Sequence, residues 1–256
     1  MTDKEIKKYK YKYELHLHSS EASACARSTA VEMCEACKNA GYDGFFITNH
    51  AWGGNTCVDR SLPWKEWVRE FSKPYYLAKE WGDQNDFKVF FGYESGYNGT
   101  EFLIYGVTPE WLEEHEELHD ATVAQQLKIV HEGGGIVVHA HPFREEWYIP
   151  EVRLFPDDVD GVEGVNATHA SHLSKSHNNP EFDVKAIAYA REHSFFMTAG
   201  SDVHSVHLFG GGIMTKDPIN SPKDLINLLK SDTMYLMTDG DRYYDRYGNI
   251  VKEYEG

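Results

Sequence analysis

The chain has 256 residues, 41% of them hydrophobic, and it carries 41 acidic against 25 basic residues for a net charge of −16. It has no run of about 18 or more apolar residues and no apolar segment after its positively charged start, which argues against a membrane span and a secretory signal. An acidic surface repels phosphate backbones and disfavours stable binding to long nucleic acids. We therefore expect a cytoplasmic protein with one sizeable core.

Strand-like and helical patterns alternate along the chain. A period-two run at 13–17 precedes a helix at 29–40, which begins with a capping box formed by Thr29 and Glu32. Further strands are expected at 44–49, 87–94, 101–107, 135–141, 159–165, 194–201 and 233–238, and further helices at 63–82, 121–132, 180–193 and 222–230.

This alternation predicts an α/β protein with a mostly parallel sheet, and about seven such units in one domain predict a barrel. Because no linker or repeat divides the chain, we expect a single domain with its core at about 11–238. Residues 239–256 are expected to form a surface hairpin around 247–249 or a loose tail.

Residue types that bind metals lie at the carboxyl ends of many of these predicted strands. They are His16 and His18, His50, Glu94, His139 and His141, and Asp202 and His204. In a parallel barrel these ends meet at one face, where active sites lie. One histidine at a strand end is usually structural, but this repeated placement favours a shared metal site.

The spacing of two histidine pairs supports this interpretation. Side chains two residues apart on a strand point the same way, so His16 and His18 can bind one cation while Leu17 faces the opposite layer. The same argument applies to His139 and His141. Imidazole and carboxylate together suit zinc, iron or manganese.

The order of the motifs ELHLHSSEASACA, AGYDGFFITNHAW, GYE, VVHAHPFR and TAGSDVHS resembles the polymerase and histidinol phosphatase (PHP) superfamily across residues 14–205. The resemblance implies a distorted (β/α)7, TIM-like barrel that holds two or three divalent metals and often hydrolyses phosphoesters. It implies one metal on His16, His18, Glu94 and Asp202, a second served by His50 and His204, and a third served by His141 with Glu94 as a bridge.

The sequence departs from the pattern of these relatives at two places. Many relatives carry an aspartate or histidine six or seven residues after the His-x-His pair, where this chain has Ala24 and Cys25. Glu21 is the nearest substitute and Cys25 a poorer one. Some relatives have another histidine after the strand corresponding to 101–107, and this chain has none there. We expect two metals and leave the third open.

Two further features bear on function. Arg144 follows His141 closely and is a candidate clamp for phosphate oxygens, because guanidinium binds them with two parallel hydrogen bonds; the alternative is a surface salt bridge. His169, His172 and His177 cluster in a segment that is expected to be a solvated loop; the alternative is that it borders the substrate pocket.

The hypothesis is a metal-dependent phosphoesterase that acts on a small phosphorylated metabolite through a metal-activated hydroxide. Glu94 would bridge the cations, Arg144 would hold the phosphate, and His141 or His204 would protonate the leaving oxygen. The alternatives are a proofreading-type exonuclease, disfavoured by the acidic charge, and a non-enzymatic metal-binding module. The sequence leaves the natural substrate, the metal and the oligomeric state open.

Overall fold

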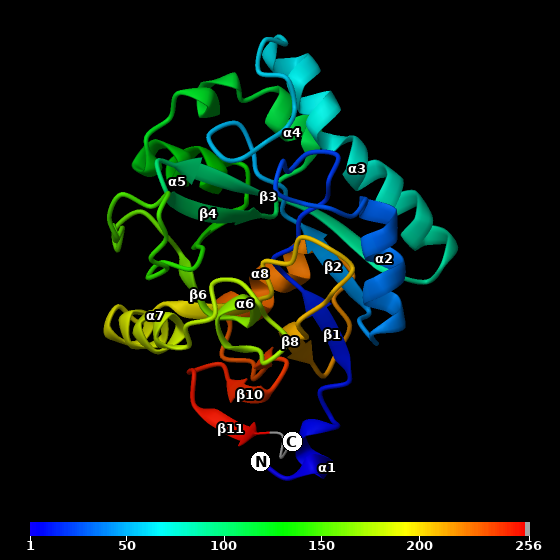
Figure 1. Cartoon of the computed structure of the whole chain (residues 1–256), viewed down its shortest axis with the longest axis vertical. Helices are drawn as coiled ribbons and strands as arrows, with labels where there is room; N and C mark the ends of the chain where they lie inside the picture. The colour runs from blue at the N-terminus through cyan, green and yellow to red at the C-terminus, as the bar shows by residue number, and fades with distance from the viewer. Residues whose placement is uncertain (254–256) are drawn as a thin grey trace.

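The protein is built around one large curled sheet (Figure 1). The structure, a computed structural model, describes residues 1–253. Within them, eleven strands follow the order β11-β10-β9-β8-β1-β2-β3-β4-β5-β6-β7. Their bounds are β1 Tyr11–Glu14, β2 Gly44–Ile47, β3 Lys88–Tyr97, β4 Thr100–Tyr105, β5 Ile136–His139, β6 Gly161–Asn166, β7 Phe196–Gly200, β8 Gly211–Thr215, β9 Leu236–Asp239, β10 Arg242–Asp245 and β11 Ile250–Glu253.

The sheet mixes parallel and antiparallel pairs, so the expectation of a mostly parallel sheet is wrong. Strands β1, β2 and β3 pair in parallel, as do β5, β6 and β7. Strand β4 is antiparallel to both of its neighbours, and β8 is antiparallel to β1 and β9. The β3–β4 connection is a tight hairpin in which Asn98 and Gly99 have φ of 51° and 87°, the backbone that such hairpins require.

Strand β7 lies at one edge of the hydrogen-bonded order, yet the curl of the sheet brings it against β8 and β9. Side-chain hydrogen bonds, and not backbone hydrogen bonds between paired strands, connect β7 to this part of the sheet. Gly211 N, at the start of β8, donates to Ser201 Oγ, directly after β7, at 3.0 Å. Tyr235 donates to the Met197 carbonyl at 2.5 Å. The structure therefore shows an α/β protein with a curled, mixed sheet, and the (β/α)7 barrel stays a prediction.

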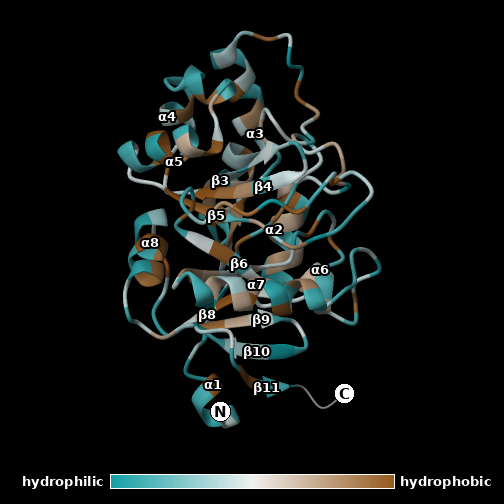
Figure 2. Cartoon of the chain, turned by 90° about the vertical axis from the view of Figure 1, so that its left-hand side faces the viewer, coloured by the Kyte–Doolittle hydropathy of each residue, from teal (hydrophilic) through white to brown (hydrophobic). Residues whose placement is uncertain are grey.

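Helices lie outside the sheet (Figure 2). Their bounds are α1 Asp3–Ile6, α2 Ala30–Asn39, α3 Trp64–Gln84, α4 Pro109–Glu113, η1 Glu116–His119, α5 Val123–Glu132, α6 Ala167–Ala170, α7 Glu181–Glu192 and α8 Pro222–Lys230. The buried residues of these helices are mostly apolar, such as Met33, Cys34 and Cys37 of α2. Thr29 and Glu32 form the predicted capping box of α2. No helix in residues 1–253 is long and apolar enough to cross a membrane.

The last strands of residues 1–253 lie beside the start of the chain. Strands β10 and β11 form an antiparallel hairpin whose turn includes Gly248 at φ 78°. Strand β10 extends the sheet from β9, and α1 lies next to the hairpin at the bottom of Figure 1. Of the segment 239–256, for which a hairpin around 247–249 or a loose tail was expected, the described part forms the hairpin, and residues 254–256 lie outside the described residues.

Candidate metal centre

The segment after β1 carries the first two histidines into the interior. Its extended backbone is held by a hydrogen bond from His18 N to the Val203 carbonyl, at 2.9 Å, and by one from Leu17 N to Thr48 Oγ1, also at 2.9 Å. Leu17 packs in an apolar cluster with α2. The imidazoles of His16 and His18 face the mouth of the sheet, which is the side where the carboxyl ends of its parallel strands meet, and their centroids are 5.1 Å apart. The alternation expected from the sequence is therefore present.

Two carboxylates from distant strands meet these imidazoles. His16 Nε2 lies 3.2 Å from Glu94 Oε1 and 3.3 Å from Asp202 Oδ1. His18 Nε2 lies 3.1 Å from the same Asp202 oxygen and 3.5 Å from Glu94 Oε2. All four residues are buried. The structure thus brings together the four residues that the resemblance assigns to one metal.

The spacing and the hydrogen bonding of this cluster fit a cation. Ligand atoms about 2.0–2.1 Å from a tetrahedral zinc ion lie roughly 3.3–3.4 Å from one another, close to the distances above. The buried atoms His16 Nε2, His18 Nε2 and Glu94 Oε2 have no hydrogen-bond partner, although each is near an opposite charge or dipole. Buried polar atoms are rarely left unsatisfied, so an arrangement that directs several lone pairs at one point fits metal ligation.

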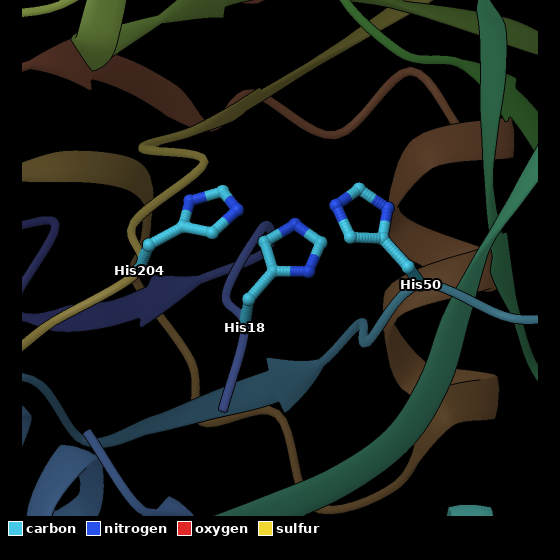
Figure 3. A group of neighbouring side chains, drawn as sticks. All are labelled: His18, His50 and His204. Atoms are coloured by element: carbon cyan, nitrogen blue, oxygen red, sulfur yellow. The ribbon is translucent and has the colours of Figure 1, made fainter. Parts of the chain in front are cut away.

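Two more groups of possible ligands adjoin the first. In one, nitrogen atoms of His18, His50 and His204 lie within 4.8 Å of one another. Figure 3 shows the rings of His50 and His204 turned toward each other with His18 between them. In the other, Glu94 and Glu101 lie 2.8 and 3.5 Å from His50 Nδ1. Glu94 therefore stands between separate sets of imidazoles, as a bridging carboxylate would.

Glu101 is a candidate ligand that the sequence analysis missed. Its carboxylate lies 3.6 Å from His141 Nε2, which is itself 3.3 Å from Glu94 Oε1. Because β4 runs antiparallel, its amino end reaches the mouth, whereas a parallel strand would have placed its carboxyl end there. The Asn98–Gly99 pair, a strong hairpin signal, would have predicted this reversal.

A buried glutamate orients two of the histidines. Glu163 Oε1 lies 2.9 Å from His16 Nδ1, and Glu163 Oε2 accepts hydrogen bonds from His141 N and Asn166 Nδ2, both at 3.0 Å. Hydrogen bonds of this kind fix the ring and tautomer of a metal-binding histidine. Burial opposes protonation of His16, but the neighbouring carboxylates outweigh it and raise its pKa well above the ordinary value. The cluster therefore favours positive charge.

Arg144 lies inside the site rather than on the surface. Its Nη1 donates to Asp202 Oδ2 at 2.6 Å, and its Nε donates to His169 Nε2 at 3.0 Å. Its Nη2 is buried without a partner. His169 is buried and its Nδ1 lies 2.7 Å from Asp183, so the expectation of a solvated loop is wrong for this histidine.

Two predicted ligands are not brought to the cluster. Glu21 accepts hydrogen bonds from Ala30 N, at 3.0 and 3.2 Å, and so caps α2 instead. His139 stacks on Phe102 with centroids 4.9 Å apart and belongs to none of the metal-capable groups among residues 1–253. The period-two alternation fails here because β5 ends at His139 and His141 has a φ of 28°, which turns its ring into the mouth. Burial lowers the pKa of His139 to about 3.

The centre opens into two clefts. One, of about 490 Å³, is lined by His50, Glu101 and Arg144 together with Trp147 and Tyr148. The other, of about 730 Å³, is lined by residues that include Arg27, Lys175 and His207. Cys25, His177, Asp202 and His204 line both clefts. A small molecule can therefore approach the ligand groups from solvent.

The sequence matches no protein-family model and no curated protein. Its structure is similar to that of a two-domain protein from Bacteroides vulgatus described as containing a predicted PHP-like metal-dependent phosphoesterase, with a TM-score of 0.65 and 13% identity. That match covers 91% of this chain, which spans 66% of the length of the two-domain protein.

Two other solved structures share the fold. PsfC from Pseudomonas syringae has a TM-score of 0.53 and 15% identity, over 84% of this chain and 88% of PsfC. An amidohydrolase from Chromobacterium violaceum, solved with sulfate and without metal, has a TM-score of 0.51 and 15% identity, over 75% of this chain and 87% of that protein. The predicted resemblance to PHP proteins is confirmed as a resemblance of fold.

Proposed function

We propose that the protein is a metal-dependent hydrolase that cleaves a phosphoester of a small metabolite. The observation that carries this proposal is the set of buried, unpartnered nitrogen and oxygen atoms on His16, His18 and Glu94, whose neighbours His50, Asp202 and His204 line an open cleft. A structural metal site is saturated by protein ligands, whereas a catalytic site keeps positions open to solvent or substrate. This favours an enzyme over a non-enzymatic metal-binding module.

Four residues would hold the first cation: His16, His18, Glu94 and Asp202. A second would be held by His50 and His204. A further cation would lie near His141 Nε2, which is 3.3 Å from Glu94 and 3.6 Å from Glu101. Bound divalent cations supply Lewis-acid chemistry, since they make water more acidic and neutralise charge on phosphate oxygens. Zinc, iron and manganese all accept this combination of imidazole and carboxylate.

The chain itself would bind and orient the substrate. Arg144 is fixed by Asp202 and His169, which leaves its Nη2 as a donor for a phosphate oxygen. A donor that is already in place stabilises developing negative charge without reorganisation. His141 and His204 lie beside the cleft, and a ring that is not engaged with a cation can donate a proton to the leaving oxygen.

The experiment is a comparison of metal content and hydrolysis in the wild type and two variants. His16→Ala should lose metal and turnover of a phosphomonoester, whereas His131→Ala, which removes an imidazole from a surface pair with Asp160, should lose neither. Full turnover by chelator-stripped protein would overturn the proposal. Preferential cleavage of labelled single-stranded DNA would favour the nuclease alternative, and cleavage of amides alone would overturn the phosphoester part.

A further inference from the structure

His169 is a buried histidine that lies between a carboxylate of α7 and the arginine of the candidate metal centre. It belongs to α6, the short helix that directly follows β6, and its ring meets Phe182 of α7 edge-on with centroids 5.2 Å apart. Its Nε2 accepts a hydrogen bond from Arg144 Nε at 3.0 Å, and its Nδ1 lies 2.7 Å from Asp183 Oδ1. Both ring nitrogens are therefore engaged inside the protein.

The partners of His169 define where its proton lies. Arg144 stays protonated in proteins, so its Nε–H is always a donor and needs a lone pair on Nε2. Burial, assisted by the charge of Arg144, lowers the pKa of His169 well below its ordinary value, which keeps the ring neutral. A neutral ring with a lone pair on Nε2 carries its proton on Nδ1 and donates it to Asp183.

Asp183 is held in the form that accepts this hydrogen bond. Its second oxygen, Oδ2, accepts from Asn166 N at 3.2 Å, and this donor belongs to the backbone at the end of β6 and cannot turn away. Burial raises the pKa of Asp183 well above its ordinary value, but a proton on either oxygen would oppose one of the two donors. Carboxylate, imidazole and guanidinium thus form one buried chain in which every donor meets an acceptor.

This chain is one of two anchors for the guanidinium of Arg144. His169 holds Nε, and Asp202 Oδ2 holds Nη1 at 2.6 Å. Because the group is planar, two held nitrogens fix the direction of the third, Nη2, which is buried without a partner. Arg144 lines the cleft of about 490 Å³. With the contact to Asp202 alone, the group would be free to rotate about that contact.

We propose that His169 and Asp183 are positioning residues for Arg144. Asp183 fixes the tautomer of His169, and His169 fixes the direction in which Arg144 offers Nη2 to a phosphate oxygen. This inference rests on the proposed function and assigns to it two residues that lie outside the metal ligands and do not line either cleft. Their effect on turnover should nevertheless be large, because a misplacement of about 1 Å can cost about 10²-fold in rate.

The test compares two substitutions of His169 that each keep one of its hydrogen bonds. The amide of glutamine reaches the place of Nε2 and can still accept from Arg144, whereas the amide of asparagine reaches the place of Nδ1 and can only donate to Asp183. At equal metal content, His169→Asn should lower kcat/KM for a phosphomonoester by about 10–100-fold, and His169→Gln should retain most of it. The control is His172→Asn, which removes an exposed imidazole paired with Asp241 in the same segment and should change nothing.

A double-mutant cycle separates positioning from a general loss of structure. In an Arg144→Met background, His169→Asn should cause no further loss of kcat/KM, because His169 acts through Arg144. Nitrogen-15 NMR of the wild type should show the His169 ring protonated on Nδ1 and not on Nε2.

Equal losses in the two His169 variants, an undiminished loss in the Arg144→Met background, or the opposite tautomer would overturn the inference, while turnover by the wild type would leave the proposed function standing. A wild type that binds metal but hydrolyses no phosphomonoester would overturn both.

Discussion

Replacement of Glu163 by glutamine should weaken metal binding although Glu163 itself is not among the expected ligands. The carboxylate accepts three hydrogen bonds: from His16 Nδ1, from His141 N and from Asn166 Nδ2. A glutamine offers one oxygen and one NH₂ group. Its oxygen should face the two fixed donors, His141 N and Asn166, and its NH₂ group should then face the imidazole of His16.

That orientation changes the tautomer of His16. Nδ1 would have to accept a hydrogen bond, so the proton would move to Nε2, the atom that lies 3.2 Å from Glu94 and 3.3 Å from Asp202. A protonated Nε2 has no lone pair for a cation. Losing such a partner of a metal-binding histidine costs about 10–100-fold in affinity, or roughly 1.4–2.7 kcal/mol.

The assay is a competition between the protein and a chelating dye for zinc, in wild type, Glu163→Gln and Glu192→Gln. The last variant removes the same charge from an exposed position on α7 and should bind zinc as the wild type does. Circular dichroism confirms that each variant is folded. If folded Glu163→Gln kept wild-type zinc affinity, the proposed orientation of His16 by Glu163 would be refuted.

Three further outcomes are expected. Arg144→Met should lower kcat/KM for a phosphomonoester by about 10²–10³-fold at equal metal content, since it removes a fixed donor to the phosphate; unchanged steady-state kinetics would contradict this. In calorimetry, Glu101→Gln should weaken the binding of the last metal equivalent by about tenfold or more and leave the affinity for the first unchanged. An unaltered binding isotherm would exclude Glu101 as a ligand. Glu21→Ala should leave the metal content unchanged. It should lower the free energy of unfolding by about 1 kcal/mol in urea titrations, because it removes a cap of α2. Loss of metal in this variant would show that Glu21 is a ligand after all.

Much of the site was predictable because its residues follow strands that run in the direction expected from the sequence. His16, His18, His50, Glu94 and Asp202 were all predicted from their position at strand ends, and β1, β2 and β3 do run in parallel. Local periodicity and capping also placed α2 and α8 within a residue or two of their observed ends.

The errors arise where the chain reverses or where context overrides the local pattern. Strand β4 is antiparallel, which hid Glu101. Strand β8 begins with Gly211 and Gly212, and no strand was expected there, because pairing with β9 fixes these glycines in the sheet and local periodicity cannot show it. His139 and His141 do not share a face, because β5 ends at His139 and the chain turns at His141, which has a φ of 28°.

Buried charge is the signal that was underused. Glu163 lies within the fully buried strand β6, where a carboxylate is costly unless it is paired. Such a residue indicates partners that sequence separation conceals, here His16, which lies 147 positions earlier. Periodicity cannot reveal this contact, because it depends on how the sheet curls.

The most direct test of the metal centre is anomalous diffraction from crystals grown with zinc and, separately, with manganese. Our account predicts an anomalous peak within bonding distance of His16 Nε2, His18 Nε2, Glu94 and Asp202, with a second peak beside His50 and His204. Crystals that bind these ions only on the surface, with the six side chains arranged as they are here, would contradict it.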